Sequence, residues 1–141
     1  QRTPIKKGCA EVLAEGTYAA LFAIGSMVET AWQVRKKLAE KGIPTTVVNA
    51  RFAMPLDKNC LRKLAESHPL LVTMEENVAS GGFGEHVAAF LEEEALHTKV
   101  LRIAIPDCFV EHGSVGELKK ALGLDADSVT EKILAELPEE L

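Results

Sequence analysis

Residues 71–85 read LVTMEENVASGGFGE, and this stretch decides the fold class. A short apolar run ends in two adjacent carboxylates and an asparagine, and a glycine cluster then opens an amphipathic helix. Residues 45–57, TTVVNARFAMPLD, repeat the plan with a β-branched strand, a turn and an aspartate that can cap the next helix. Such strand–turn–helix units predict a parallel sheet covered by helices, with its functional edge at the carboxyl ends of the strands.

The other apolar runs extend this plan over the whole chain. Strands are predicted at Glu11–Ala14, Tyr18–Ile24, Thr45–Ala50, Leu70–Met74 and Val100–Ile105. Helices are predicted at Met27–Lys41, after Asp57, at Phe83–Leu96, after Ser114, and from Asp127 or Ser128. We therefore expect an α/β fold, a three-layer α/β/α domain around a mostly parallel, mixed five-stranded sheet. Glu11–Ala14 would make the sheet mixed by forming an edge hairpin with the next strand.

The first helix and the chain boundaries carry further expectations. Helical spacing predicts that the first helix buries five apolar residues, with Ser26 as its cap: Val28, Ala31, Trp32, Leu38 and Ala39. Residues 1–16 are interpreted as a linker and edge strand, and residues 17–141 as a single domain. The polar start without a methionine indicates a fragment of a longer chain.

Composition limits the kinds of partner. A chain of 141 residues with 47% hydrophobic residues suits one domain, and no apolar run is long enough to predict a membrane span. The net charge of −5 gives no basic stripe for nucleic acid. Three scattered cysteines form no CxxC pair, which favours a reducing cytosol.

The glycine cluster has two interpretations. Residues 80–84, SGGFG, lead into a helix whose free N–H groups favour an anion, so Gly81 and Gly82 are candidate site residues. The dinucleotide fingerprint fails, however, because Val87 stands at its last glycine position. The alternative is that the glycines only allow a tight turn beneath a neighbouring surface.

Charged residues at the same edge are the next candidates. Glu75 and Glu76 alternate along a strand, so they cannot share one pocket unless the strand has already ended. One could act as acid, base or hydrogen-bond acceptor, and the other could pair with Arg51 from the neighbouring strand end. The alternative is a purely structural ion pair.

The histidines do not form a recognisable catalytic set. His68 and His97 are predicted at helix ends, capping or solvated, and His86 in a first helical turn. His112 follows the last strand and is the best candidate of the four. No spacing indicates a metal site, and no Ser/His/Asp or Cys/His set is evident.

The order of the motifs resembles a known family. The motifs are IGSM at 24–27, VVNARF at 47–52, PLD at 55–57, EEN at 75–77 followed by GGFG at 81–84, and PD at 106–107 followed by EHG at 111–113. In this order they closely resemble the C-terminal domain of the 1-deoxy-D-xylulose-5-phosphate synthases, a branch of the transketolase family. The resemblance extends from about Pro4 to Leu137.

The resemblance implies a specific chemistry. Members of this branch use thiamine diphosphate and Mg²⁺ to decarboxylate pyruvate and to join the two-carbon unit to glyceraldehyde 3-phosphate, in isoprenoid biosynthesis. The cofactor lies between the first two domains, so no catalytic, cofactor-binding or metal residue is carried over to this chain. The resemblance implies instead a domain that supports the assembly and a homodimer, with the N-terminal domains of the same enzyme as partners. It also implies a location in the cytoplasm, or in a plastid for a plant or algal parent.

Two other functions are compatible with the residues. One is a regulatory module that binds a phosphorylated ligand, such as an isoprenoid diphosphate, at the glycine loop. The other is a protein-interaction domain, as in the β-type subunits of related transketolases and 2-oxo acid dehydrogenases.

Overall fold

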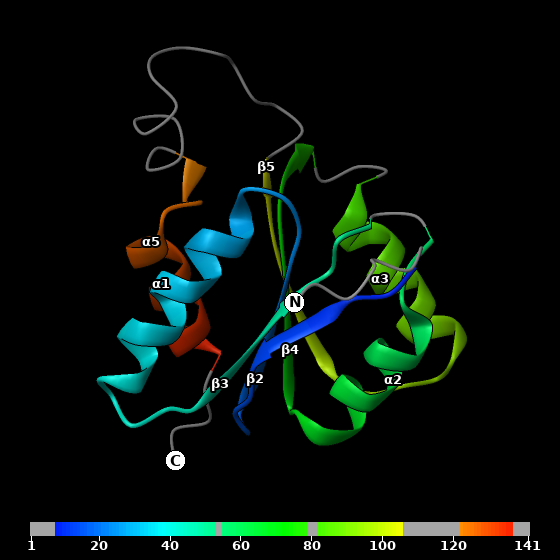
Figure 1. Ribbon diagram of the computed structural model, residues 1–141, viewed down its shortest axis with the longest axis horizontal. Helices are drawn as coiled ribbons and strands as arrows, with labels where there is room; N and C mark the ends of the chain where they lie inside the picture. Colours follow the sequence, from blue (N-terminus) through cyan, green and yellow to red (C-terminus); the bar gives the residue numbers. More distant parts are fainter. Residues whose placement is uncertain (1–7, 53–54, 79–81, 106–121, 137–141) are drawn as a thin grey trace, which may run out of the picture.

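The computed structural model describes residues 8–52, 55–78, 82–105 and 122–136, which form a five-stranded sheet between two layers of helices (Figure 1). The strands are β1 (Glu11–Ala14), β2 (Ala19–Ala23), β3 (Thr45–Asn49), β4 (Leu70–Val78) and β5 (Lys99–Ile105). The helices are α1 (Met27–Ala39), α2 (Lys58–Ser67), α3 (Phe83–Glu93) and α5 (Ala126–Ala135). The strand order is β1-β3-β2-β4-β5. The predicted mixed sheet and three-layer α/β/α class are confirmed.

The sheet buries a separate apolar core on each face. One core lies under α1 and α5 and includes Leu21, Val72 and Ile133. The other lies under α2 and α3 and includes Phe22, Leu71 and Val87. Because neighbouring residues of β2 and β4 point to opposite faces, both strands are buried on both sides, which explains their continuous apolar sequences.

The first strand does not form the predicted hairpin. β1 pairs antiparallel with β3, while β2 is held between β3 and β4 in parallel pairing. The chain therefore passes the start of β3 on its way from β1 to β2, and Gly16 lies at the point of closest approach. Its N–H donates to Thr46 Oγ1 (2.8 Å), and a side chain here would lie 2.3 Å from the backbone nitrogen of Thr45.

The helices differ from prediction at several points, and α1 and α3 end two and three residues earlier than expected. Trp32 and Ala39 are exposed, and α1 instead turns Met27, Val34 and Leu38, among others, into the core. Ser26 stands at the cap position of α1 but makes no side-chain cap bond. The last helix begins at Ala126, earlier than expected, because Asp125 caps it by accepting the N–H of Ser128 at 3.2 Å.

The helix predicted after Ser114 lies outside the described residues. Among the helices of the described part of the chain, none has the length and apolar character that crossing a membrane requires.

Candidate functional site

The carboxyl ends of the four parallel strands meet at one edge of the sheet, where the candidate residues were expected. The structure describes Arg51, Glu75, Glu76 and Gly82 at this edge. Gly81 and His112 lie outside the described residues.

Glu75 is the central group at this edge. It is fully buried within β4, which continues to Val78 rather than ending at Met74 as predicted, and its carboxylate lies at the N-terminus of α3. One oxygen accepts the N–H of Phe83 at 2.8 Å, and the other accepts the N–H of Gly84. The helix dipole and these two donors stabilise the negative charge. The anion expected at the glycine loop is thus the protein's own carboxylate.

Gly84 allows α3 to approach β4 this closely. A Cβ at this position would lie 2.8 Å from Thr73 Oγ1, 2.9 Å from Glu75 Oε2 and 3.1 Å from Arg102 Nε. Next to it, the Phe83 ring stacks on Phe22 of β2 with centroids 5.3 Å apart. The last glycine of GGFG, Gly84, is therefore a packing requirement, in keeping with the tight-turn interpretation.

Gly84→Ala is expected to destabilise the chain by about 1–3 kcal/mol, because the new methyl group overlaps buried polar atoms. In an unconstrained helix the same change would stabilise by about 1 kcal/mol. Urea unfolding followed by circular dichroism measures the difference. Gly25→Ala is the control, since nothing lies within 4 Å of that position and only its φ of +62° opposes a side chain. A stabilised Gly84→Ala variant would show that the helix does not sit this close.

Arg51 occupies a strained turn at the end of β3. Its φ is +64°, which is uncommon for a residue other than glycine. Asn49 Oδ1 accepts the Arg51 N–H at 3.0 Å, and Phe52 N donates to the Ala50 carbonyl at 2.7 Å, so the turn is held by its neighbours. The guanidinium pairs with Glu11 of β1 at 2.8 Å. The predicted pairing with a β4 carboxylate is thus replaced by a pair with the edge strand, because β1 lies beside β3.

Asp57 has a second role that sequence reasoning missed. Its Oδ1 accepts the N–H of Cys60 at 3.0 Å and caps α2, as predicted. Its Oδ2 accepts the N–H of Ala10 at 2.8 Å, 47 residues away, and so fixes the segment that leads into β1. No local pattern signals the second bond, because it depends on the pairing of β1 with β3.

His68 is a buried structural residue at the opposite edge of the sheet. It stands at the C-terminal cap of α2, as predicted, but is only 7% exposed rather than solvated. Its Nε2 lies 2.7 Å from Thr46 Oγ1, and its Nδ1 lies 3.0 Å from the carbonyl of Leu64. It thereby connects α2 to β3. His86 and His97 are exposed.

Cys60 is expected to react slowly with thiol reagents. Burial, and then the charge of Asp57, raise the pKa of its thiol to about 11. At pH 8 its thiolate population should be roughly a hundredfold below that of an ordinary cysteine, rising about tenfold per pH unit up to pH 10. Iodoacetamide labelling of a Cys9→Ser, Cys108→Ser chain tests this, with the same protein in urea as the fast control. Equal rates in the folded and unfolded protein would contradict the burial of the thiol.

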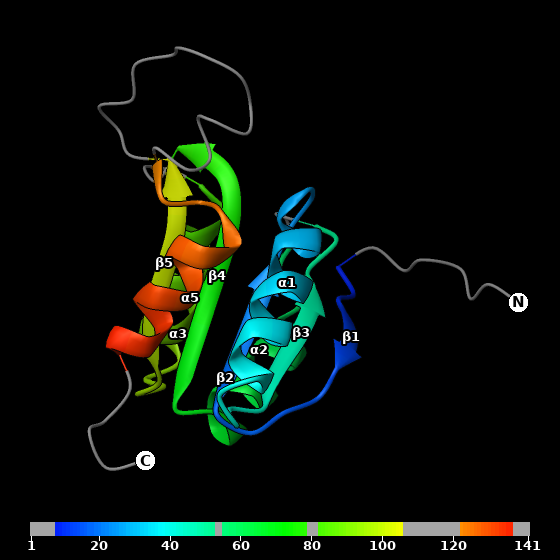
Figure 2. The same ribbon diagram turned by 90° about the vertical axis from the view of Figure 1, so that its left-hand side faces the viewer.

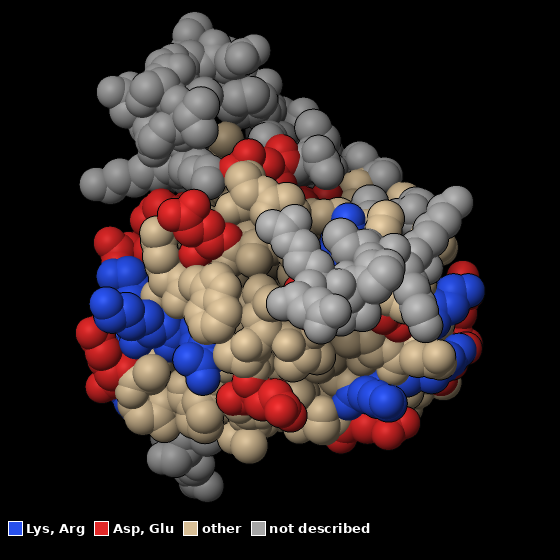
Figure 3. All heavy atoms as spheres, viewed as in Figure 1, with Lys and Arg blue, Asp and Glu red and all other residues tan. Residues whose placement is uncertain are grey.

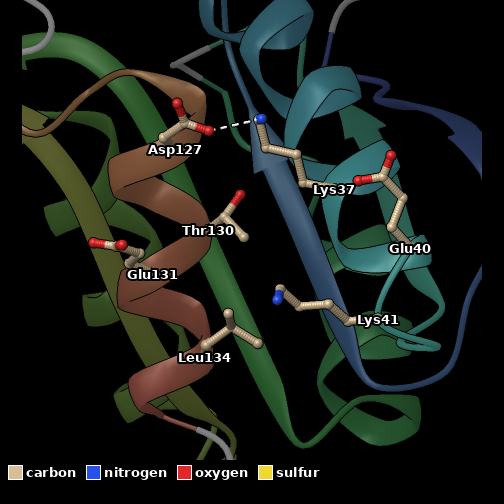
Figure 4. A pocket seen from close by; sticks show the side chains of 7 residues that line it. All are labelled: Lys37, Glu40, Lys41, Asp127, Thr130, Glu131 and Leu134. Atoms are coloured by element: carbon tan, nitrogen blue, oxygen red, sulfur yellow. Dashed lines mark ion pairs between the residues drawn. The ribbon is translucent and has the colours of Figure 1, made fainter.

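A polar groove between α1 and α5 was not predicted (Figure 4). It has a volume of about 540 Å³ and is open to solvent. Lys37 comes from α1, Glu40 and Lys41 follow the end of that helix, and Asp127 and Glu131 come from α5. The Lys37–Asp127 ion pair of 2.7 Å spans it, and the lining carries side chains of both signs. The groove therefore fits a helix–helix contact better than a ligand site.

The described residues do not form a complete reaction centre. Among them there is no group of three or more His, Cys, Asp and Glu side chains that could hold a metal ion. The buried carboxylate of Glu75 is already satisfied by backbone N–H groups, and Arg51 by Glu11. The two charged groups, Glu75 and Arg51, are thus already paired within the domain.

Comparison with known proteins shows the family of the chain. The family model for the transketolase C-terminal domain matches residues 8–129. The chain is 54% identical over 127 residues to 1-deoxy-D-xylulose-5-phosphate synthase of Lachnoclostridium phytofermentans, covering 89% of this chain and 20% of that protein. It is 47% identical over 131 residues to 1-deoxy-D-xylulose-5-phosphate synthase 1 of Geobacter metallireducens, covering 92% and 21%. The chain thus spans about a fifth of the length of these curated relatives.

Solved structures give the same result. A split-gene transketolase, described as an inactive β4 tetramer, superposes with a TM-score of 0.88 at 30% identity, covering 94% of this chain and 43% of that one. Transketolase from Campylobacter jejuni superposes with a TM-score of 0.64 at 19% identity, covering 92% and 19%, and supports the fold alone. Because the family model matches residues 8–129, which is most of this chain, the chain belongs to the transketolase C-terminal domain family.

Proposed function

We propose that this chain is the C-terminal domain of a thiamine-diphosphate-dependent enzyme that makes 1-deoxy-D-xylulose 5-phosphate. The substrates would be pyruvate and glyceraldehyde 3-phosphate, CO₂ would be released, and the product would feed isoprenoid biosynthesis. The observation that carries the proposal is the 54% identity to a synthase of this name over 89% of the chain.

Within such an enzyme, we assign this domain a non-catalytic role. The fit of the cofactor to the described residues supports this assignment. A diphosphate needs backbone or cationic donors, and the N–H groups of Phe83 and Gly84 at the α3 N-terminus already donate to Glu75. The described residues also lack a cluster of metal ligands for Mg²⁺. These residues do not fit the cofactor, so no catalytic step is assigned to them.

The role left for the domain is support of the assembly. The proposed partners are the preceding domains of the same enzyme and a second subunit in a homodimer. Since the relatives that match are bacterial enzymes, we place the enzyme in the cytoplasm.

The phosphate-binding regulatory role is less well supported. It needed a free helix N-terminus after the glycine loop, and the Glu75 carboxylate fills that position. The interaction role has more support, because a chain with 30% identity and a TM-score of 0.88 is described as a tetramer of β chains. A protein-interaction subunit of a split transketolase is therefore the second candidate.

A chimera tests the proposal. In the Lachnoclostridium phytofermentans synthase, the 127 aligned residues are replaced by the matching part of this chain. We expect the chimera to convert pyruvate and glyceraldehyde 3-phosphate to 1-deoxy-D-xylulose 5-phosphate only with thiamine diphosphate and Mg²⁺. The chain alone should make no product and give no heat when it is titrated with the cofactor. A folded chimera without activity beside an active parent would contradict the assigned reaction, and cofactor binding by the chain alone would contradict the non-catalytic role.

A further inference from the structure

Two large apolar side chains are exposed in the described part of the chain, and both lie near the edge strand β1. Trp32 of α1 is 41% exposed and Val12 of β1 is 49% exposed. Trp32 is the single tryptophan of the sequence. Tryptophan is among the residue types that contribute most to protein interfaces, so this exposure needs an explanation.

The contacts of Arg35 show on which side of α1 Trp32 lies. The Arg35 guanidinium lies 5.9 Å from the Trp32 ring centroid, and its Nε donates to the Thr45 carbonyl of β3 at 3.0 Å. Since residues three apart share one flank of a helix, Trp32 lies on the flank of α1 that faces β3. β1 is the strand beside β3, and Figure 2 shows α1, β3 and β1 in this order.

In the described part of the chain, β1 is an outermost strand and pairs only with β3. Leu13 packs toward the α1 core, while Val12 pairs with Val48, which belongs to the opposite core. Apolar side chains therefore flank the open edge of β1 on both faces of the sheet. In Figure 3 an uncharged area occupies the middle of the face that carries α1 and β3, with charged side chains around it. We define the edge surface as Trp32, Val28, Leu13 and Val12.

The edge surface lies where the chain enters the domain. Residues 8–10 are fixed beside it, because Ala10 N–H donates to Asp57 Oδ2 at 2.8 Å and Gly8 lies against Pro55. The matching family is described as a C-terminal domain, and roughly four-fifths of the length of the relatives lies outside the part that matches this chain. In those relatives the preceding polypeptide joins the domain through the segment before β1.

We propose that the edge surface is the docking site for the preceding domain of the same polypeptide, which covers Trp32 and the open edge of β1. This inference rests on the proposed function, because it takes the chain to be the last domain of a longer enzyme. The exposed Trp32 ring, which lies beside the Arg35 guanidinium, would provide an apolar anchor. A second copy of this chain on the same surface is the competing outcome.

Photocrosslinking in the chimera described above identifies what covers the surface. Trp32→p-benzoylphenylalanine places the probe on the surface, and Ala89→p-benzoylphenylalanine, on the exposed side of α3 across the sheet, is the matched control. After irradiation, mass spectrometry should find crosslinks from position 32 to the preceding four-fifths of the same chain, at least tenfold more abundant than those from position 89. Crosslinks to a second copy, or equal yields at both positions, would overturn the inference.

The result is independent of the catalytic assay. An inactive chimera with the expected crosslinks would support the docking site and overturn the proposed reaction, and an active chimera without them would do the reverse. If the chimera does not accumulate, the labelled chain is mixed with the separately expressed remainder of the relative, where no crosslink from position 32 would count against the proposal. Trp32→Lys should lower the unfolding midpoint of the isolated chain by no more than about 5 °C, because the side chain is 41% exposed and its loss removes mainly the contact with Arg35. A larger loss would show that Trp32 supports the domain itself.

Discussion

Replacing Glu75 by alanine should reduce the free energy of unfolding of this chain by about 3–5 kcal/mol, one of the two largest effects of any single substitution that we expect. The carboxylate is fully buried and accepts the N–H groups of Phe83 and Gly84. Its removal leaves two backbone donors unsatisfied in the core, leaves a cavity, and removes the negative charge that the α3 dipole stabilises. Glu75→Gln should cost about 2–3 kcal/mol, because the amide keeps one acceptor but points its NH₂ group at a backbone N–H.

Urea unfolding monitored by circular dichroism gives these values directly. Glu92→Gln is the matched control, since Glu92 is exposed on the same helix, and it should change the free energy of unfolding by no more than about 0.5 kcal/mol. A Glu75→Gln variant as stable as its parent would mean that the carboxylate does not cap α3. It would also reopen the helix N-terminus as a site for an external anion.

The substitution Gly16→Ala should have a similarly large effect, for a different reason. Its Cβ would lie 2.3 Å from Thr45 N, 2.5 Å from Pro44 C and 2.6 Å from Thr45 C, all of them backbone atoms. Backbone cannot move aside as a flexible side chain can, so the crossing from β1 to β2 must open. We expect a loss of about 3–5 kcal/mol and at least tenfold faster hydrogen exchange at the β1 amides that pair with β3.

Gly42→Ala separates this clash from the general cost of replacing a glycine. Gly42 has a φ of +77° and no atom within 4 Å of its missing Cβ, so the change should cost only about 1–2 kcal/mol. Hydrogen exchange in β1 should stay at the parent level. If Gly16→Ala behaved like Gly42→Ala, the chain could not pass as close beneath β3 as the structure places it.

The sequence predicted the central part of the fold well. Short apolar or β-branched runs in the sequence predicted β2, β3 and β4, and Asp57 caps α2 as expected. Such features depend on residues within a few positions of each other, so a local pattern can reveal them. The expected burial of Trp32 was wrong, because helical spacing locates an apolar stripe but does not tell how much of the helix the sheet covers.

The site was less predictable than the fold. Glu75, Gly82 and Arg51 lie at the carboxyl ends of the strands, where the sequence placed them, but the partners of Glu75 and Arg51 were not predicted. Arg51 pairs with Glu11, 40 residues away, because β1 lies beside β3. Glu75 turns back onto the helix that follows it, which alternation along the strand could not indicate.

By itself, the sequence determined the fold class, most strand and helix positions, and the family, since each rests on local periodicity or on the order of motifs. Only the tertiary structure decided which groups meet. In the folded chain β1 pairs with β3 rather than with β2. The Glu75 carboxylate caps the N-terminus of α3, and Trp32 is exposed near the unpaired edge of β1. The physical reason is that strand pairing and close packing join residues far apart in the chain, and these contacts depend on the assembled sheet.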